Sequence, residues 1–182
     1  VMIQVISKIS IYHWIRLGPL IHFLTLILLI CTLFPQFGIA AKGARRWISL
    51  GFFSMQPGEM VKYTYILMSL YFFKEFPHMG NKKRIFHSFL LVAPLMVLLK
   101  QPDYGTFLIC FFVISFIGFL GPVPRKLYYA SVVVGGAIGT GLLFLAPYRI
   151  QRLLTFLDPW KNPKTSGFQI IQSYLAFANG RV

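Results

Sequence analysis

Most of this chain consists of long apolar runs separated by short polar segments. Five runs, at about residues 17–37, 59–76, 85–99, 105–121 and 127–148, approach the length needed to cross a bilayer core of about 30 Å. Only 12% of the residues are charged and 57% are hydrophobic, so the chain has too little charge to cover a soluble core. The sequence therefore predicts an all-α fold, a polytopic transmembrane helix bundle.

Two of these runs have features that bear on helix geometry. The third is short and contains Pro94, with Pro102 just beyond it. A proline inside a helix removes a backbone donor and bends the helix, which a membrane protein tolerates when neighbouring groups satisfy the freed carbonyls. The fifth contains "VVVGGAIGTG", whose small residues allow close helix approach. We expect a kinked third helix and a closely packed fifth one.

The net charge of +14 comes from 18 Lys and Arg against four acidic residues. In a soluble protein it would suggest nucleic acid, but in a bilayer protein these cations gather in the loops and face anionic headgroups. Membrane lipid is therefore the expected partner, and nucleic acid is not. The four histidines are dispersed, and Cys31 and Cys110 lie inside apolar runs, so we expect neither a metal site nor a disulfide.

The distribution of charge between the runs predicts a topology. The basic segments 74–84 and 124–126 are separated by two runs, so they lie on one side, which the positive-inside rule makes cytoplasmic. The other connecting segments are then external, and they carry Lys42, Arg45, Arg46, Arg149, Arg152, Lys161 and Lys164. An external side with this many Lys and Arg residues suits a phosphate-bearing ligand near the outer leaflet.

Three of the four acidic residues lie at the external ends of runs, where ionisable groups are costly and often functional. Each also has a local structural explanation. Glu59 can start a helix and pair with Lys62 one turn later, and Asp103 can cap the helix that follows it. Asp158, which precedes Pro159, can form a turn. Both interpretations stay open for all three acids.

Five short motifs along the chain together resemble the SEDS family of bacterial shape, elongation, division and sporulation proteins. They are "GARRWISLG", "QPGE" with Lys62 three residues on, "QPDYGT", "YRIQRLLTFLDPW" and "GFQIIQS", in the order and spacing of that family from about Tyr12 to the last residue. Within the family, "FLDPW" is more similar to the division and sporulation members than to the elongation member.

The resemblance implies an integral membrane peptidoglycan glycosyltransferase of ten helices, which polymerises lipid II into glycan strands during cell division or septal wall synthesis. The five runs, within residues 1–148, would be its third to seventh helices. Residues 149–182 would be the start of a large extracellular loop and a truncated next helix. We therefore expect an internal fragment that is inactive alone. The implied location is the bacterial inner (cytoplasmic) membrane at the division septum, with a class B penicillin-binding protein transpeptidase and other divisome proteins as partners.

The chain departs from the family's motifs at two positions. The family usually has Gln-Pro-Ser-Glu in the first loop, but residue 58 is Gly here. The large loop usually reads Asp-Pro-x-x-Asp-Pro, or keeps the second acid alone, whereas this chain has Asp158 followed by Asn162. We carry the catalytic role over to Asp158, with position 162 as the alternative site of the family's acid.

Polymerisation needs a base and a cationic site. Asp158 would take the proton of the acceptor's C4 hydroxyl as that hydroxyl attacks the donor's anomeric carbon. Arg and Lys, or a divalent cation (Mg²⁺ or Mn²⁺) as the one cofactor considered, would stabilise the departing undecaprenyl pyrophosphate. Trp47 and Trp160 can stack on sugars or serve as interfacial anchors. The expected substrate-binding residues are Arg45, Arg46, Trp47, Glu59, Lys62, Gln101, Asp103, Arg149, Arg152, Trp160, Gln169, Gln172 and Ser173.

Two other function classes stay open. A lipid II flippase also handles a pyrophosphate and a long tail, and a non-catalytic divisome scaffold would recruit the transpeptidase. A carrier should place charged residues deep within its spans. Lys62 is the one charged side chain clearly inside a run, and it lies within a turn of the external end. The sequence therefore favours the enzyme.

Overall fold

The structure is a computed structural model of the chain, and it describes residues 8–41, 44–49, 51, 53–144, 150, 154–163 and 167–180. The chain divides into two compact units, Val1–Val132 and Val133–Val182. Among the described residues, the first unit contains four complete α-helices, one short 3-10 helix, a small sheet and the beginning of another α-helix. The second unit contains the rest of that helix and the segments after it.

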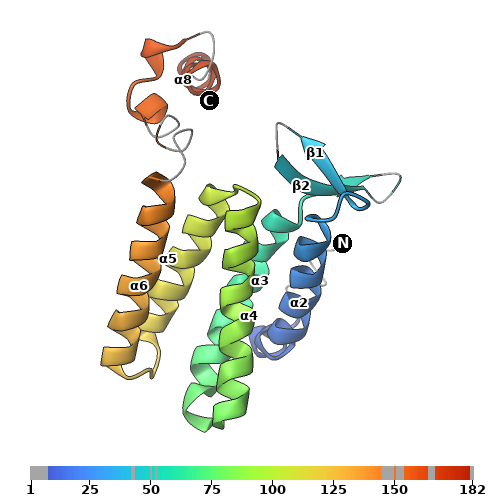
Figure 1. Ribbon diagram of the computed structural model, residues 1–182, viewed down its shortest axis with the longest axis vertical. Coiled ribbons are helices and arrows are strands. Elements are labelled where there is room, and N and C mark those ends of the chain that lie inside the picture. Colours follow the sequence, from blue (N-terminus) through green and yellow to red (C-terminus); the bar gives the residue numbers. More distant parts are fainter. Residues whose placement is uncertain are drawn as a thin grey trace. The chain divides into compact units, whose positions relative to one another are not determined.

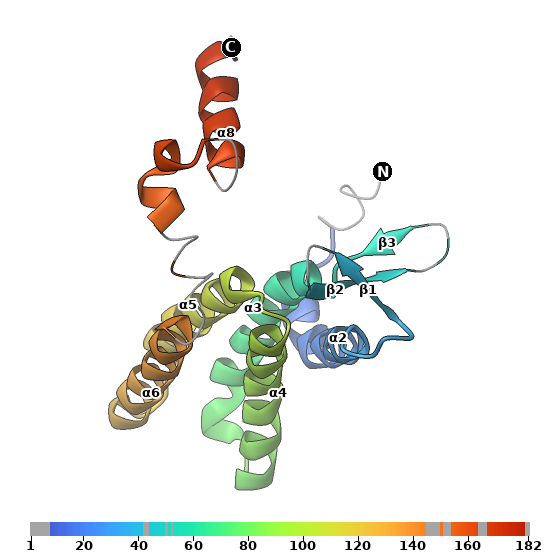
Figure 2. The same cartoon turned by 45° about the horizontal axis from the view of Figure 1, so that its top comes forward.

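The helices of the first unit are α2 (Ile11–Cys31), α3 (Pro57–Glu75), α4 (Asn81–Lys100) and α5 (Tyr104–Leu120), and α6 (Arg125–Phe144) begins in it. α3 packs against α2, α4 and α5, and α3, α4 and α5 run in alternating directions (Figures 1 and 2). The short helix η1 (Phe76–His78) joins α3 to α4. The observed architecture is thus a helix bundle centred on α3.

The described helices follow the predicted apolar runs, with one shift. No bound of α3, α4, α5 or α6 differs from its run by more than four residues, and residues 145–148 lie outside the described part. α2 begins and ends six residues earlier than expected. It ends at Cys31 because the Leu29 carbonyl accepts hydrogen bonds from the Thr32 hydroxyl at 2.7 Å and from the Gln101 side-chain amide at 3.0 Å. These donors replace the N–H of a further helical turn.

A small antiparallel sheet lies between α2 and α3, in a segment that the sequence analysis treats as a loop. Its strands are β1 (Gly38–Ala41), β2 (Ala44–Ser49) and β3 (Ser54–Met55), in the order β1-β2-β3. β1 and β2 pair in register Ile39 to Trp47, and β2 and β3 pair Ile48 to Met55. Gly51, in the turn between β2 and β3, has a φ of 85°, a conformation that glycine adopts without strain. We call the end of the bundle that carries these strands the sheet end.

Pro94 lies inside α4, and side chains of α2 and α3 bond two backbone carbonyls in the turn before it. Pro94 has no N–H for the Leu90 carbonyl four residues earlier. That carbonyl lies 3.1 Å from Nε2 of His22 in α2, whose Nδ1 lies 3.0 Å from the Thr64 hydroxyl. The neighbouring Leu91 carbonyl accepts the Tyr65 hydroxyl at 2.7 Å. α4 is therefore one continuous helix through Pro94, as the requirement for satisfied carbonyls predicts.

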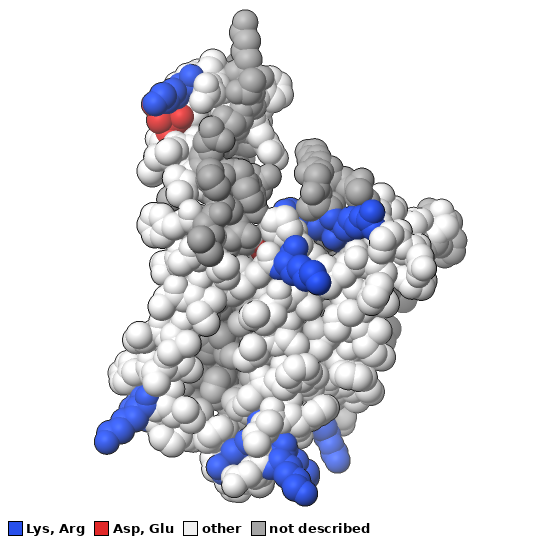
Figure 3. All heavy atoms as spheres, in the orientation of Figure 1, with Lys and Arg blue, Asp and Glu red and all other residues white. Residues whose placement is uncertain are grey.

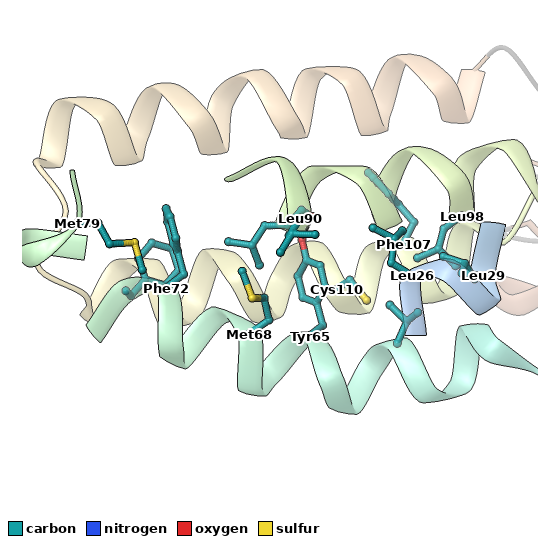
Figure 4. Packing of buried hydrophobic residues seen from close by; sticks show 13 residues of the cluster. Leu26, Leu29, Tyr65, Met68, Phe72, Met79, Leu90, Leu98, Phe107 and Cys110 are labelled. Atoms are coloured by element: carbon teal, nitrogen blue, oxygen red, sulfur yellow. Dashed lines mark hydrogen bonds between the residues drawn. The ribbon is translucent and has the colours of Figure 1, made fainter. Parts of the chain in front are cut away.

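The core of the first unit is apolar and lies around α3 (Figure 4). Val61, Tyr65 and Met68 of α3 are fully buried, with Leu29 of α2 and Leu98 of α4. Between membrane helices such contacts stabilise mainly through close packing, because lipid tails are as apolar as the core. Close approach also explains a glycine: a Cβ on Gly18 would lie 3.0 Å from the Leu67 carbonyl of α3.

The outward side chains of these helices are also apolar. Phe89 of α4 and Phe112 and Phe116 of α5 are between 63% and 67% exposed, and in water such a surface would drive association. Among the described helices, α2 meets the combined length and hydropathy requirement for crossing a membrane, with 21 residues and mean hydropathy 1.9, and α5 is apolar but shorter. A surface this apolar fits lipid as the surrounding solvent.

The second unit begins inside α6 and ends with α8 (Phe168–Asn179). Residues 154–157 are helical, and the short helix η2 (Pro159–Lys161) follows directly. η2 and α8 contact one another, and Ile171 of α8 and Thr155 are buried. Two glycines of α6 are not tightly packed here, since a Cβ on Gly136 or Gly141 would meet nothing within 4 Å. The close helix packing expected there stays a prediction.

Candidate functional site

At the sheet end, the structure brings together five residues that the sequence analysis names as substrate-binding. They come from β2, from the first turns of α3, and from the turn at residues 101–103, which we call the α4–α5 turn. The five are Arg46, Glu59, Lys62, Gln101 and Asp103. Polar groups 55 residues apart in sequence therefore meet at one end of an otherwise apolar bundle.

The side chain of Arg46 binds backbone carbonyls of the α4–α5 turn. The Nε of Arg46 donates to the Gln101 carbonyl at 3.1 Å, and its Nη2 donates to the Pro102 carbonyl at 2.6 Å. The side chain is half-buried. One planar guanidinium thus links β2 to two successive carbonyls of the turn.

Gln101 holds the same turn from the other side. Its side chain is 3% exposed, and its Nε2 donates to the Leu29 carbonyl at 3.0 Å and to the Thr32 hydroxyl. A buried amide that satisfies a helix-end carbonyl serves packing, because leaving either group unpaired would cost about 1–3 kcal/mol. Gln101 is therefore an internal tie between α2 and the turn.

Asp103 is the N-cap residue of α5. Its Oδ1 accepts from the Thr106 amide at 3.4 Å and its Oδ2 accepts from the Thr106 hydroxyl at 3.0 Å. The side chain is 8% exposed, and its carboxylate forms no ion pair with a described Lys or Arg. The first turn of α3 lies directly against it, since a Cβ on Gly58 would be 3.3 Å from Oδ2. The capping interpretation of Asp103 is confirmed.

Glu59 and Lys62 form the local ion pair that their spacing predicts. Lys62 Nζ lies 2.7 Å from Glu59 Oε2, with the Lys62 side chain 24% exposed and that of Glu59 54% exposed. A pair this open to solvent stabilises a protein by less than about 1 kcal/mol. Its main effect is to hold a positive charge one helical turn after Gly58, the residue against which the Asp103 carboxylate lies.

The remaining predicted residues of the sheet end are exposed. Arg45 is exposed and lies beside Arg46 on β2, where successive side chains point to opposite faces. Trp47 is 38% exposed and pairs across the sheet with Ile39. Figure 3 shows Lys and Arg side chains at the sheet end and at the opposite end of the helices, with an uncharged band between them on the face drawn.

Asp158 belongs to the second unit and stands at a turn. Its backbone amide donates to the Leu154 carbonyl at 2.9 Å, which ends the helical residues 154–157. Its side chain is exposed and makes no capping hydrogen bond to η2. The turn predicted for this acid is confirmed, and its carboxylate is free of the capping role that Asp103 has.

Gly167 fixes the segment around Asp158. Its amide donates to the Asn162 carbonyl at 3.0 Å. A Cβ at this position would lie 2.0 Å from the Pro159 carbonyl oxygen and 3.0 Å from that of Asn162. Because both neighbours are backbone, no side-chain rotation relieves the overlap. The approach of α8 to η2 therefore requires glycine at residue 167.

The other predicted residues of the second unit have simpler surroundings. Trp160 is 62% exposed, and Gln169 and Gln172 are exposed on α8. The Ser173 hydroxyl donates to the Gln169 carbonyl at 3.0 Å, within the same helix. Arg149 and Arg152 lie outside the described residues. Among the residues that the structure does describe, no group of three His, Cys, Asp or Glu side chains could hold a metal ion.

Sequence reasoning missed three residues that shape these sites. Thr106 completes the cap of Asp103, and the spacing Asp-x-x-Thr could have shown it. Gly167 could have been suspected from its place directly before an apolar helix. Thr32, which bonds both Leu29 and Gln101, gives no signal in the sequence, because its partner lies 69 residues away.

Comparison with known proteins gives a family and a fold. The family of FtsW, RodA and SpoVE, described as "Cell cycle protein", matches residues 1–182. The curated "Probable peptidoglycan glycosyltransferase FtsW" of Nitrosococcus halophilus is 34% identical over 178 residues, which are 95% of this chain and 45% of that protein. The chain spans less than half the length of the curated relatives that it matches.

Two solved structures share the fold. One is a chain from the structure titled "Structural coordination of polymerization and crosslinking by a peptidoglycan synthase complex". It has 27% identity and a TM-score of 0.61, over 95% of this chain and 52% of that one. The other is the rod shape determining protein RodA of Thermus thermophilus, with 21% identity and a TM-score of 0.58 over 97% of this chain and 71% of that one. Since the family match covers the whole sequence and the fold agrees with it, this chain belongs to the FtsW, RodA and SpoVE (SEDS) family and is a polytopic membrane helix bundle.

Proposed function

We propose that the protein containing this chain is a peptidoglycan glycosyltransferase that polymerises lipid II into glycan strands during division or septal wall synthesis. The observation that carries the proposal is the polar group at the sheet end, where Arg46, Glu59, Lys62, Gln101 and Asp103 meet on an apolar membrane bundle. The glycosyltransferase name of the Nitrosococcus halophilus relative supports it.

The cations of this group would hold the leaving group. Lys62 and Arg45 present ammonium and guanidinium groups at the sheet end, and such donors stabilise a pyrophosphate as its negative charge grows. Arg149 and Arg152 would add to this charge. Lys62 suits the role because its Nζ is already held 2.7 Å from Glu59 Oε2, so its side chain loses less conformational freedom when substrate binds.

Asp158 would act as the general base. As the acceptor's C4 oxygen forms its bond to the donor's anomeric carbon, the hydroxyl proton passes to the Asp158 carboxylate. The bond from the anomeric carbon to the pyrophosphate oxygen breaks with its electron pair, and undecaprenyl pyrophosphate leaves. The exposed carboxylate of Asp158, with no capping bond to η2, is chemically available for this transfer. Trp160, Gln169, Gln172 and Ser173 would contact the sugars.

A divalent cation fits this chemistry as an addition to the protein's own charges. Asp158 is a single exposed carboxylate, so Mg²⁺ or Mn²⁺ would be held mostly by the pyrophosphate oxygens, with few protein ligands, as is usual for Mg²⁺. The ion would neutralise the leaving group's charge. Loss of polymer in chelator, restored by Mg²⁺ or Mn²⁺, would support this part of the proposal.

A transpeptidase of the class B penicillin-binding protein type is the proposed partner, together with other divisome proteins. The solved peptidoglycan synthase complex that shares this fold supports a coupled assembly. The proposed location is the bacterial inner membrane at the division septum. A pull-down of the membrane-embedded protein with and without the transpeptidase, followed by a polymerisation assay, tests the partnership.

The interior of the described bundle favours an enzyme over a lipid II carrier. Among the described residues, the buried polar side chains in mid-bundle are His22, Thr25, Thr64 and Ser69, with no Asp, Glu, Lys or Arg. A carrier that alternates access would be expected to place charged residues along a path at the bilayer midplane. Within the described residues of the first unit, the buried acid, Asp103, instead lies at the sheet end.

The deciding experiment uses the full-length protein with its transpeptidase and purified lipid II. Asp158→Asn keeps the shape of the side chain and removes its basicity, so glycan strands should fall by roughly 100-fold or more, as expected for loss of a general base. Asn162→Asp should retain activity or raise it. Strong synthesis by Asp158→Asn, with a large gain from Asn162→Asp, would place the base at residue 162. Lipid movement across vesicles without polymer would favour the carrier.

A further inference from the structure

We infer that Arg46 is a positioning residue, which fixes the α4–α5 turn and thereby the place of Asp103 beside the first turn of α3. For its effect on catalysis this inference rests on the proposed function. It assigns Arg46 a different role from that of a phosphate ligand, which its charge and its motif suggest. The geometry of the guanidinium and of the turn carries the argument.

The guanidinium of Arg46 is already engaged along one edge. Its Nε and Nη2 donate to the carbonyls of Gln101 and Pro102, at 3.1 and 2.6 Å. Nε and Nη2 form one of the parallel donor pairs through which arginine makes bidentate hydrogen bonds to a carboxylate or a phosphate. Here that pair binds two consecutive backbone oxygens, which a substrate cannot displace without unpairing them.

The turn is fixed from three directions. Arg46 holds it from β2, and the Gln101 side chain ties it to Leu29 of α2. The Asp103 amide donates to the Leu98 carbonyl at 2.9 Å, which continues the end of α4. Of these ties, the one from Arg46 is charge-assisted, and hydrogen bonds of that kind are about twice as strong as neutral ones.

The position of Asp103 depends on this arrangement. Its carboxylate caps α5 through Thr106 and lies against Gly58, so that a Cβ there would be 3.3 Å from Oδ2. Lys62 lies one helical turn after Gly58 on α3. A shift of the turn by about 1 Å would therefore alter the distance between Asp103 and Lys62, and misplacements of that size cost up to about 100-fold in rate.

Two measurements on the full-length protein with its transpeptidase test the inference. The first is amide hydrogen exchange at residues 101–107. Arg46→Ala should raise exchange there by roughly tenfold or more, because two carbonyls of the turn lose their donor. Arg45→Ala is the matched control, since Arg45 is exposed on the same strand and should leave exchange at the turn unchanged. This readout does not depend on any catalytic activity.

The second measurement is polymerisation kinetics. Arg46→Ala should lower kcat by roughly 10- to 100-fold with KM changed less than about threefold, the pattern of lost positioning. Arg46→Lys should restore part of kcat, because one ammonium can bond one of the two carbonyls. Lys83→Ala, at the opposite end of the bundle, should behave like wild type.

Each contrary result has a separate meaning. Unchanged exchange at residues 101–107 in Arg46→Ala overturns the inference whatever the kinetics show. A raised KM with unchanged kcat, with the difference in KM from wild type becoming smaller at high salt, overturns it in favour of direct phosphate binding. Absence of polymer from wild type would instead count against the proposed function, and the exchange experiment would still decide the role of Arg46.

Discussion

Some residues of the proposed site also stabilise the local structure. Asp103 caps α5 and is nevertheless buried without a described ion-pair partner, and Glu59 begins α3 while holding Lys62. A local structural explanation therefore does not compete with a functional one at these positions. Structure fixes the carboxylate in place, and a fixed charge is what electrostatic catalysis requires.

Gly167 is the residue whose replacement has the most direct consequence. Gly167→Ala places a methyl group about 2 Å from the Pro159 carbonyl oxygen, so η2 and α8 must separate. Amide exchange at residues 158–163 should rise by roughly tenfold, and polymer formation in the full-length protein should fall with it. Gly136→Ala is the matched control, because a Cβ there meets nothing within 4 Å. Equal exchange in the two variants would show that the contact does not hold this segment.

Elements differ in how well the sequence predicts them. The helices are predictable because the thickness of a bilayer sets the length of an apolar run, and the runs of α3 and α5 match closely. The sheet is not, because its strands have four, six and two residues, too few for an alternating pattern to stand out. The shift of α2 was equally hidden, since Gln101, which helps to end it, lies 72 residues from Leu29.

Within the candidate site, contacts between residues close in sequence could be predicted, and contacts between distant residues could not. The pairs Glu59–Lys62 and Asp103–Thr106 are three residues apart and follow from helix geometry. The bonds of Arg46 join residues that are 55 and 56 positions apart. No helical or strand period links positions that far apart, so the sequence could name Arg46 as a cation of the site without showing what it binds.

The helix α4, with Pro94 inside it, provides a test at the scale of elements. Tyr65→Phe removes the hydroxyl that donates to the Leu91 carbonyl at 2.7 Å and leaves the ring in place. The free energy of unfolding in micelles should fall by about 0.6 kcal/mol, and by no more than about 1.7 kcal/mol, the average and the maximum for hydrogen bonds between membrane helices. Tyr63→Phe, on the same helix but 70% exposed, should change it little. If the free energy of unfolding falls more in Tyr63→Phe than in Tyr65→Phe, the Leu91 carbonyl needs no side-chain donor.

For the whole molecule, the two ends of the bundle should face different compartments. The sheet end carries Arg46 and Lys62, and the opposite end carries the first turns of α4 and α6, with Lys82, Lys83 and Arg125. The positive-inside rule places the latter in the cytoplasm. The orientation follows from charge, whereas the bundle itself follows from apolar length, so the two can be tested separately.

Cysteine labelling checks this orientation. In a background with Cys31 and Cys110 replaced by serine, Lys161→Cys should react with an impermeant thiol reagent in intact spheroplasts, because residue 161 is exposed and on the predicted external side. Lys82→Cys, exposed at the start of α4, should react only after lysis. The reverse pattern would invert the topology and remove the proposed site from the side where glycan strands are made.

The donors that satisfy α4 around Pro94 also bear on how the chain enters its membrane. His22 and Tyr65 belong to α2 and α3, which the ribosome completes before α4 emerges. When α4 partitions into the bilayer, the side-chain donors to its Leu90 and Leu91 carbonyls are already there. A segment that would insert poorly alone can then insert against its neighbours. The order of the helices in the chain is thus also a workable order of assembly.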